Sequence, residues 1–367
     1  MRGLSEGEKS AIVSSESNTQ DVPVHKEIPM LARTNPRRIE KIANVLCSMP
    51  IPESGGGMDF HSSEKNGVRT YAADLFPGLG DSEAVNFFAF SCVQNHGFWY
   101  ASDGRYESPI TGHIRGKEYR GSALLFAALK QEFDRDRGIF EPYRLAHMSG
   151  VAIQHLLSDD LGPMPFPDIE ARVALTHRYG AYFRAALSGL NSPKKMIEVA
   201  NLAAQPLAAL YRLFSWVPGF WEDPLQKKIG LFAMEMISRP ERFLVPAERE
   251  DLRPIIDYHI MRVCLRSGMV LLAKVLRTAN SARLFVTATI EEAIRRATYQ
   301  AVHTLATIVR ARLPRLRRVM AFVDHALWRA RSYCPELVEP NCPSCDFRVA
   351  CRKDTSLFQP VFRTLFY

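Results

Sequence analysis

Four cysteines close to the end of this sequence constrain the fold more than any other feature. They are spaced C-x7-C-x2-C-x5-C, at Cys334, Cys342, Cys345 and Cys351. A C-x2-C step places two thiols on one tight turn, and four soft ligands in one short segment predict a metal site. Zinc and an iron-sulfur cluster both accept four thiolates. The spacing alone leaves both open.

Composition sets broad limits on the class of protein. The chain has 367 residues with 47% hydrophobic content, enough for a large core and for two or three domains. Its net charge of +8 favours polyanionic partners such as nucleic acid. No apolar run reaches the roughly 18 residues of a membrane span, and the first residues lack the apolar core of a signal peptide. We therefore expect a cytoplasmic protein with no membrane partner.

The first third of the sequence predicts a tail, a helix and a small sheet. Residues 1–34 have the polar composition of a disordered tail. Residues 35–121 form the next segment, in which an apolar face predicts a helix from Pro36 to Leu46. The triple glycine at 55–57 indicates a hinge. Residues 84–108 are rich in aromatic residues and contain Asp103-Gly104, a hairpin-type turn, which predicts a small antiparallel sheet.

The remainder predicts a mainly α fold. Helical spacing of apolar residues recurs over 122–332. One helix begins near Asp257, and Thr289 to Glu292 has the pattern of a capping box that opens another helix. Arginines between 310 and 318 follow that helix and are candidates for phosphate contacts, although a solvated helix end is an equal alternative. We expect a metal loop at 333–353 and a tail at 354–367.

The order of these features resembles the helix-hairpin-helix DNA glycosylase superfamily, and endonuclease III in particular. Those proteins carry a catalytic Asp in the pattern Val-Asp-Thr-His-x-x-Arg-Val, which residues 256–263, Ile-Asp-Tyr-His-Ile-Met-Arg-Val, resemble. Their C-x6-C-x2-C-x5-C loop binds a 4Fe-4S cluster, and the loop here is one residue longer. The resemblance covers about 225–352 and implies a two-lobed helical fold, a 4Fe-4S cluster rather than zinc, and DNA as partner.

The same resemblance implies roles for individual residues. Asp257 would stabilise the oxocarbenium-like sugar or activate water, with a purely capping role as its alternative. Lys228 would be an amine nucleophile, although a surface lysine is the alternative, and the incomplete Pro-Gly hairpin at 217–230 gives little support for a lyase step. Tyr258 and Arg262 would contact the substrate.

A second resemblance covers the middle of the chain. Asn86-Phe87, Phe98-Trp99, residues 119–129 and residues 218–223 are similar to the queuosine salvage family. That family shares the glycosylase-like helical fold, lacks the cysteine loop and hydrolyses a 7-deazaguanine nucleotide. The resemblance implies that Phe98 and Trp99 line a base pocket, where they could stack on the base. Their alternative is a place in the core of the sheet.

Three functions follow from these features. The leading hypothesis is an N-glycosidase that removes a damaged or modified base from DNA. The second is a hydrolase of a free modified nucleotide of the 7-deazapurine type. The third is a non-catalytic protein that carries a cluster and binds nucleic acid. Salt-dependent affinity for a duplex would separate the first from the second.

Overall fold

The computed structural model describes residues 31–51, 58, 60, 71–164, 166–186 and 189–367. Residues 31–367 belong to one compact unit. The expected hinge at 55–57 and most of the expected tail lie outside the described residues. Residues 32–34, which the sequence placed in the tail, instead form strand β1 (Ala32–Thr34), paired antiparallel with β8 (Val270–Leu272).

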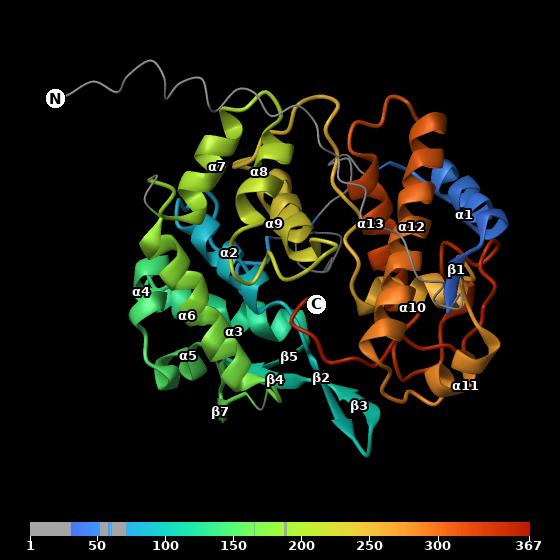
Figure 1. Ribbon diagram of the computed structural model, residues 1–367, viewed down its shortest axis with the longest axis horizontal. Coiled ribbons are helices and arrows are strands. Elements are labelled where there is room, and N and C mark those ends of the chain that lie inside the picture. The colour runs from blue at the N-terminus through green and yellow to red at the C-terminus, as the bar shows by residue number, and fades with distance from the viewer. Residues whose placement is uncertain (1–30, 52–57, 59, 61–70, 165, 187–188) are drawn as a thin grey trace. The chain divides into compact units, whose positions relative to one another are not determined.

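The described residues are mainly helical, as the sequence predicted. One group of helices contains α2 (Ala84–Gln94), α3 (Ser122–Arg135), α4 (Pro142–His147), α5 (Gly150–Leu156), α6 (Ile169–Ala185), α7 (Pro193–Asn201), α8 (Pro206–Phe214) and α9 (Lys227–Ser238). The other contains α1 (Pro36–Ser48), α10 (Tyr258–Ser267), α11 (Lys274–Ser281), α12 (Ala288–Arg312) and α13 (Val319–Tyr333). Figure 1 shows the two groups, with α2 packed on α3 and α9, and α12 packed on α1, α10 and α13.

The sheets are small. Hairpin β2 (Trp99–Ser102)–β3 (Arg105–Pro109) is followed by hairpin β4 (Thr111–Ile114)–β5 (Lys117–Arg120), and β6 (Ser158–Asp159) pairs with β7 (Gly162–Pro163). The predicted turn at Asp103-Gly104 is confirmed, with φ of +48° and +70° at its two residues. Two consecutive positive φ values are typical of a tight hairpin turn.

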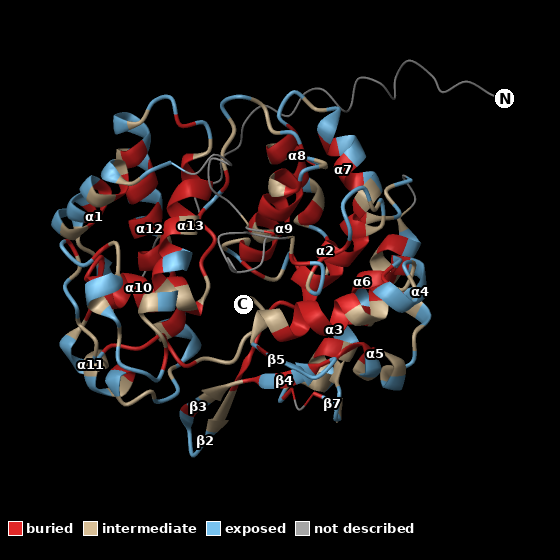
Figure 2. Ribbon diagram, turned by 180° about the vertical axis from the view of Figure 1, so that it is seen from behind, coloured by how far each residue is buried: buried red, intermediate tan, exposed pale blue. Residues whose placement is uncertain are grey.

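The prediction of a sheet is wrong for the first of the residues at 84–108. Residues 84–94 form helix α2, and every one of its residues is buried. A helix covered on all sides has no polar face, so its sequence lacks the 3.6-residue stripe and its aromatic residues favour a strand. Figure 2 shows α2 as a buried element within its group. Phe87, Phe88 and Phe90 pack there against Phe140 and other rings.

Two other predicted helices are confirmed, with changes at their ends. The helix at 36–46 continues to Ser48, and the helix near Asp257 begins at Tyr258. The predicted capping box is two residues late, because Thr287 caps α12 and accepts a hydrogen bond from the amide of Ile290 at 3.4 Å. Within the described part of the chain, helices long and apolar enough to span a bilayer are absent.

The end of α10 is tied to the segment that follows the cysteine loop. Gly268 ends the helix with φ of +80°, and a Cβ at this position would stand 3.0 Å from the Cβ of Arg352. The amides of Arg352 and Asp354 donate to the carbonyls of Ser267 and Arg266. Residues 354–367, expected as a tail, are packed, and the side chains of Leu357, Phe358 and Val361 are buried.

Candidate active site

Asp257 caps helix α10. Its Oδ1 accepts a hydrogen bond from the amide of Ile260 at 2.8 Å, while the residue keeps partial exposure. A carboxylate at a helix N-terminus is stabilised by the helix dipole. The capping role that the sequence allowed is therefore present. It leaves the carboxylate charge available to other groups.

The buried lysine that experiences the charge of Asp257 is Lys227. Burial lowers the pKa of Lys227, and the negative charge of Asp257 opposes that shift. The Nζ of Lys227 donates to Oδ1 of Asn95 at 2.7 Å. The Nζ of Lys228 instead donates to the carbonyl of Val93 at 2.6 Å, and burial together with Lys227 lowers the pKa of Lys228 to about 7. Neither lysine lies on the surface.

A buried ion pair fixes the start of α9. Arg295 of α12 donates to the two carboxylate oxygens of Asp223 at 2.7 and 2.8 Å, and both residues are at most 3% exposed. Asp223 also accepts from the amide of Lys227 at 2.7 Å and from that of Leu225 at 2.9 Å. The Arg295 guanidinium lies over the ring of Tyr367. This pair holds the first turn of α9 against α12, near Asp257.

Helix α13 adds two ionisable side chains near Asp257. Burial and the charge of Asp257 raise the pKa of Asp324 to about 8, and Lys227 opposes that shift. Asp324 therefore carries a proton at neutral pH. Burial lowers the pKa of Arg331, while Asp257 and Tyr258 favour its charged form. Among the described residues the Nε of Arg331 has no hydrogen-bond partner, and its guanidinium lies over the ring of Trp328.

The segment at 363–367 joins the two groups of helices. Its Arg363 donates to the carbonyl of Trp99 at 3.0 Å, and the carbonyl of Tyr367 accepts from the amide of Gly97 at 3.2 Å. The Tyr367 hydroxyl donates to Glu291 of α12 at 2.6 Å. Because Gly97 follows α2 and Glu291 belongs to the other group, this segment fixes the turn after α2 against α12.

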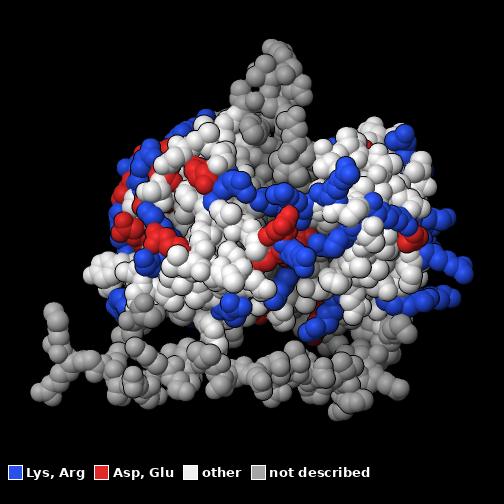
Figure 3. All heavy atoms as spheres, turned by 90° about the horizontal axis from the view of Figure 1, so that it is seen from above, with Lys and Arg blue, Asp and Glu red and all other residues white. Residues whose placement is uncertain are grey.

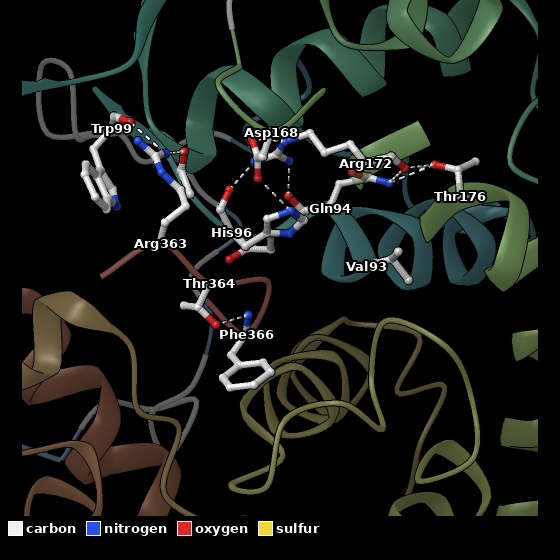
Figure 4. Close-up of polar contacts among 12 residues, drawn as sticks. Val93, Gln94, His96, Trp99, Asp168, Arg172, Thr176, Arg363, Thr364 and Phe366 are labelled. Carbon is white, nitrogen blue, oxygen red and sulfur yellow. Dashed lines mark hydrogen bonds and ion pairs between the residues drawn. The ribbon is translucent and has the colours of Figure 1, made fainter. Parts of the chain in front are cut away.

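A second buried polar cluster supports the turn after α2 (Figure 4). His96 lies 3.2 Å from Asp168, and Arg172 donates to Asp168 and to the carbonyls of Gln94 and His96. Burial and the charges of Arg172 and Lys228 hold the pKa of His96 well below its usual range. Burial would raise the pKa of Asp168, but His96 and Arg172 overcome it and hold that pKa low. The cluster braces the backbone that carries Asn95.

Phe98 and Trp99 are covered by other side chains. Phe98 is 3% exposed and meets Phe166 edge-on, whereas Trp99 is 4% exposed and stacks on Tyr106 at a centroid distance of 5.5 Å. The Arg363 guanidinium lies over the ring of Trp99, 3.9 Å from its centroid. Both aromatic side chains therefore lie in the core, which was the alternative to a place in a base pocket.

Tyr258 and Arg262, predicted to contact substrate, are buried. Tyr258 stacks obliquely on His259. Arg262 is 1% exposed; it donates to the carbonyl of Cys334 at 3.1 Å and to Gln359 at 2.7 Å, and its Nη2 lies 3.1 Å from Nδ1 of His259. Its guanidinium therefore anchors the cysteine loop to α10 and has few donors left for a phosphate.

The four cysteines lie together in the segment after α13, and none forms a disulfide. All four are partly exposed, and a 3₁₀ turn at Cys342–Ser344 begins the C-x2-C step. In the described residues no three His, Cys, Asp or Glu side chains are arranged to share a metal ion.

The predicted arginine cluster is partly neutralised. Arg310 pairs with Asp251 at 2.6 Å, Arg312 pairs with Glu40, and Arg317 lies 4.0 Å from Glu248. Figure 3 shows Lys and Arg side chains outnumbering Asp and Glu side chains on the face of the described residues seen from above. Much of the positive charge that the sequence predicted would contact phosphates is therefore paired with acidic side chains.

Sequence reasoning missed Lys227, Asp223, Arg295 and Asp324. Lys227 stands next to Lys228, which the sequence predicted as the nucleophile, and adjacent residues on a helix point in different directions. A signal for Asp324 was present, because it shares a face with Met320 and Leu327, and an acid on an apolar face is unusual.

Residues 76–220 match the model of the queuosine salvage protein family. No curated protein matches the sequence. The matched region contains α2, Asn95, His96, Phe98 and Trp99, while Lys227, Asp257 and the cysteine loop follow it. The match falls on the second of the two resemblances noted in the sequence, and the resemblance to helix-hairpin-helix DNA glycosylases stays a prediction.

Proposed function

We propose that this protein hydrolyses the N-glycosidic bond of a free modified nucleotide, of the 7-deazapurine or queuosine type. This is the function that the sequence ranked second. The observation that carries it is the placement of Asp257, whose charge acts on buried Lys227 and on protonated Asp324. The match of residues 76–220 to the queuosine salvage family supports the choice of substrate. DNA as the substrate lacks comparable support.

The proposed chemistry uses two carboxyl groups in different protonation states. As the bond between C1′ and the base nitrogen breaks, positive charge develops on the sugar, and ionised Asp257 stabilises it and takes the proton of the attacking water. Asp324, protonated near neutral pH, supplies the proton that the leaving base requires. The charge of Asp257 in turn favours the charged form of Lys227.

Lys228 has a different role in this proposal. Its amine is fully buried and engaged with the carbonyl of Val93 and with His96. It supports the turn after α2, and the sugar is released by water without a Schiff base.

The test is release of free base from a queuosine-type nucleoside 5′-monophosphate, followed by chromatography. The same modified base is offered in a DNA duplex and in an RNA strand in parallel reactions. Release from the mononucleotide alone supports the proposal. Release from the duplex alone would restore the DNA glycosylase hypothesis, and binding without release from any substrate would favour the non-catalytic alternative.

A further inference from the structure

Trp328 is an exposed aromatic residue on the face of α13 that carries Asp324. Trp328 is 44% exposed, whereas Asp324 is 6% exposed. Residues 324, 328 and 331 are spaced i, i+4 and i+7, so all three lie along one side of the helix. Asp257 acts electrostatically on the first and the last of them. The indole of Trp328 therefore lies between two side chains of the candidate site.

Contacts to the chain after α13 place the same side of the helix beside the start of α10. Arg262 donates to the carbonyl of Cys334 at 3.1 Å, and Arg266, one turn later on α10, donates to the carbonyl of Pro335 at 2.7 Å. The chain that leaves α13 thus runs in the direction of α10, from its second turn to its third. The preceding turn of α13, which carries Arg331, accordingly lies towards the first turn of α10, where Asp257 is the cap.

Arg331 holds the indole of Trp328 in a fixed orientation. Its guanidinium carbon lies over the Trp328 ring, 3.8 Å from the ring centroid. Such a contact between a cation and an indole is attractive and covers one face of the ring. Because Trp328 keeps 44% exposure, a large part of the ring system stays accessible. The result is a flat, oriented apolar surface near Asp257.

A heterocyclic base can stack on this surface. Bases stack on aromatic side chains, and removal of such a side chain typically lowers affinity about 5- to 150-fold. Phe98 and Trp99, which the sequence predicted for this contact, are 3% and 4% exposed. With the sugar at Asp257, a base that receives the proton of Asp324 would extend along α13 towards Trp328, one turn further along the helix.

We propose that Trp328 stacks on the base of the nucleotide and that Arg331 positions its indole for this contact. The assignment rests on the proposed function, because it takes the modified base to be the occupant. Trp328 then contacts the base and leaves the sugar and the phosphate to other groups. Its removal weakens binding of the nucleotide and has no effect on a ligand that lacks the base.

The first experiment measures binding by calorimetry in the Asp257→Asn protein, where the nucleotide should bind without turnover. Adding Trp328→Leu should weaken binding of the queuosine-type nucleoside 5′-monophosphate at least about fivefold, whereas Trp328→Phe should recover most of the affinity. Affinity for ribose 5-phosphate, which lacks a base, should be the same in all three proteins. Unchanged nucleotide affinity in the Trp328→Leu protein, or an equal loss for both ligands, would overturn the proposal.

Trp216→Leu is the matched control. Trp216 is 75% exposed and lines a groove with Met196 of α7 and Leu213 of α8, so its loss should leave nucleotide affinity unchanged. Failure of the proposed function has a separate signature, because binding requires no hydrolysis. Binding that depends on Trp328, without base release by the wild-type protein, would reject the hydrolase and support the stacking role. Absence of nucleotide binding would overturn both.

The second experiment tests the positioning role of Arg331. Arg331→Gln should raise KM for the nucleotide and weaken the near-ultraviolet circular dichroism of the indole, because the ring loses the cation that orients it. Arg331→Lys, which keeps a positive charge, should recover part of both signals. Equal KM in wild type and Arg331→Gln would contradict the positioning role. These two variants keep Trp328, so they decide the proposal if Trp328→Leu does not fold.

Discussion

Arg295 holds Asp223 by two hydrogen bonds in a site from which water is almost excluded. The same carboxylate accepts the amide of Lys227, so the pair positions the first turn of α9 against α12. The proposed catalytic arrangement thus depends on an ion pair that would not itself touch the substrate.

Removing one partner of this pair should be strongly destabilising. Arg295→Gln leaves Asp223 buried without its counter-charge, and the free energy of unfolding should fall by about 3–5 kcal/mol in urea denaturation. Arg296→Gln is the control, because Arg296 forms an exposed pair with Glu292 on the same helix and should cost less than about 1 kcal/mol. Equal effects of the two substitutions would show that the Asp223 pair contributes little.

Asp257→Asn separates catalysis from helix capping. Asparagine is as good an N-cap as aspartate, so the variant should fold normally. Loss of the negative charge should lower kcat at least about 100-fold, measured as base release from the nucleotide. Ligand binding should persist. A variant that turns over at the wild-type rate would remove Asp257 from the mechanism.

The two adjacent lysines should differ in their effect on the reaction. Lys227→Gln removes the positive charge that acts on Asp257 and should reduce kcat more than Lys228→Gln does. Comparison of the two variants at saturating nucleotide measures this order. The opposite order, with a covalent adduct trapped by borohydride on Lys228, would support the amine nucleophile that the sequence predicted.

Asp324 should make stability depend on pH. Its pKa is raised from 3.8 to about 8 in the folded protein by burial and by Asp257. The folded state therefore binds one more proton than the unfolded state between these values, and stability falls as pH rises through this window. Asp324→Asn should remove this contribution, so its stability relative to wild type should increase from pH 4 to pH 8. A constant difference across the window would mean that Asp324 is ionised in the folded protein.

The sequence predicted helices whose polar residues recur at helical spacing. The helix at 36–48 buries one face and exposes the other, and Asn35 caps its start. The helix after Asp257 is almost wholly buried, but its arginines recur at helical spacing and Asp257 caps it. Helix α2 is buried on every side, so no periodicity distinguishes it from a strand. Trp99 and the turn at Asp103-Gly104 were correctly placed in a hairpin because two-residue turns have a local signature.

The candidate site was harder to predict because it depends on tertiary contacts. A helix-start motif identified Asp257, but the choice between Lys227 and Lys228 depends on how α9 packs against α2. Asp324 acquires its raised pKa only after α13 is buried beside Asp257. Residues at 363–367 have no sequence motif, yet they connect Gly97 with α12.

The most direct test of the account is a competition between substrates. The full-length protein is incubated with equal concentrations of a queuosine-type nucleoside 5′-monophosphate and of a duplex carrying the same base, and the free base from each is quantified by isotope label. We predict release from the mononucleotide, its loss in Asp257→Asn, and no release from the duplex. Release from the duplex in preference to the mononucleotide would contradict the proposed function.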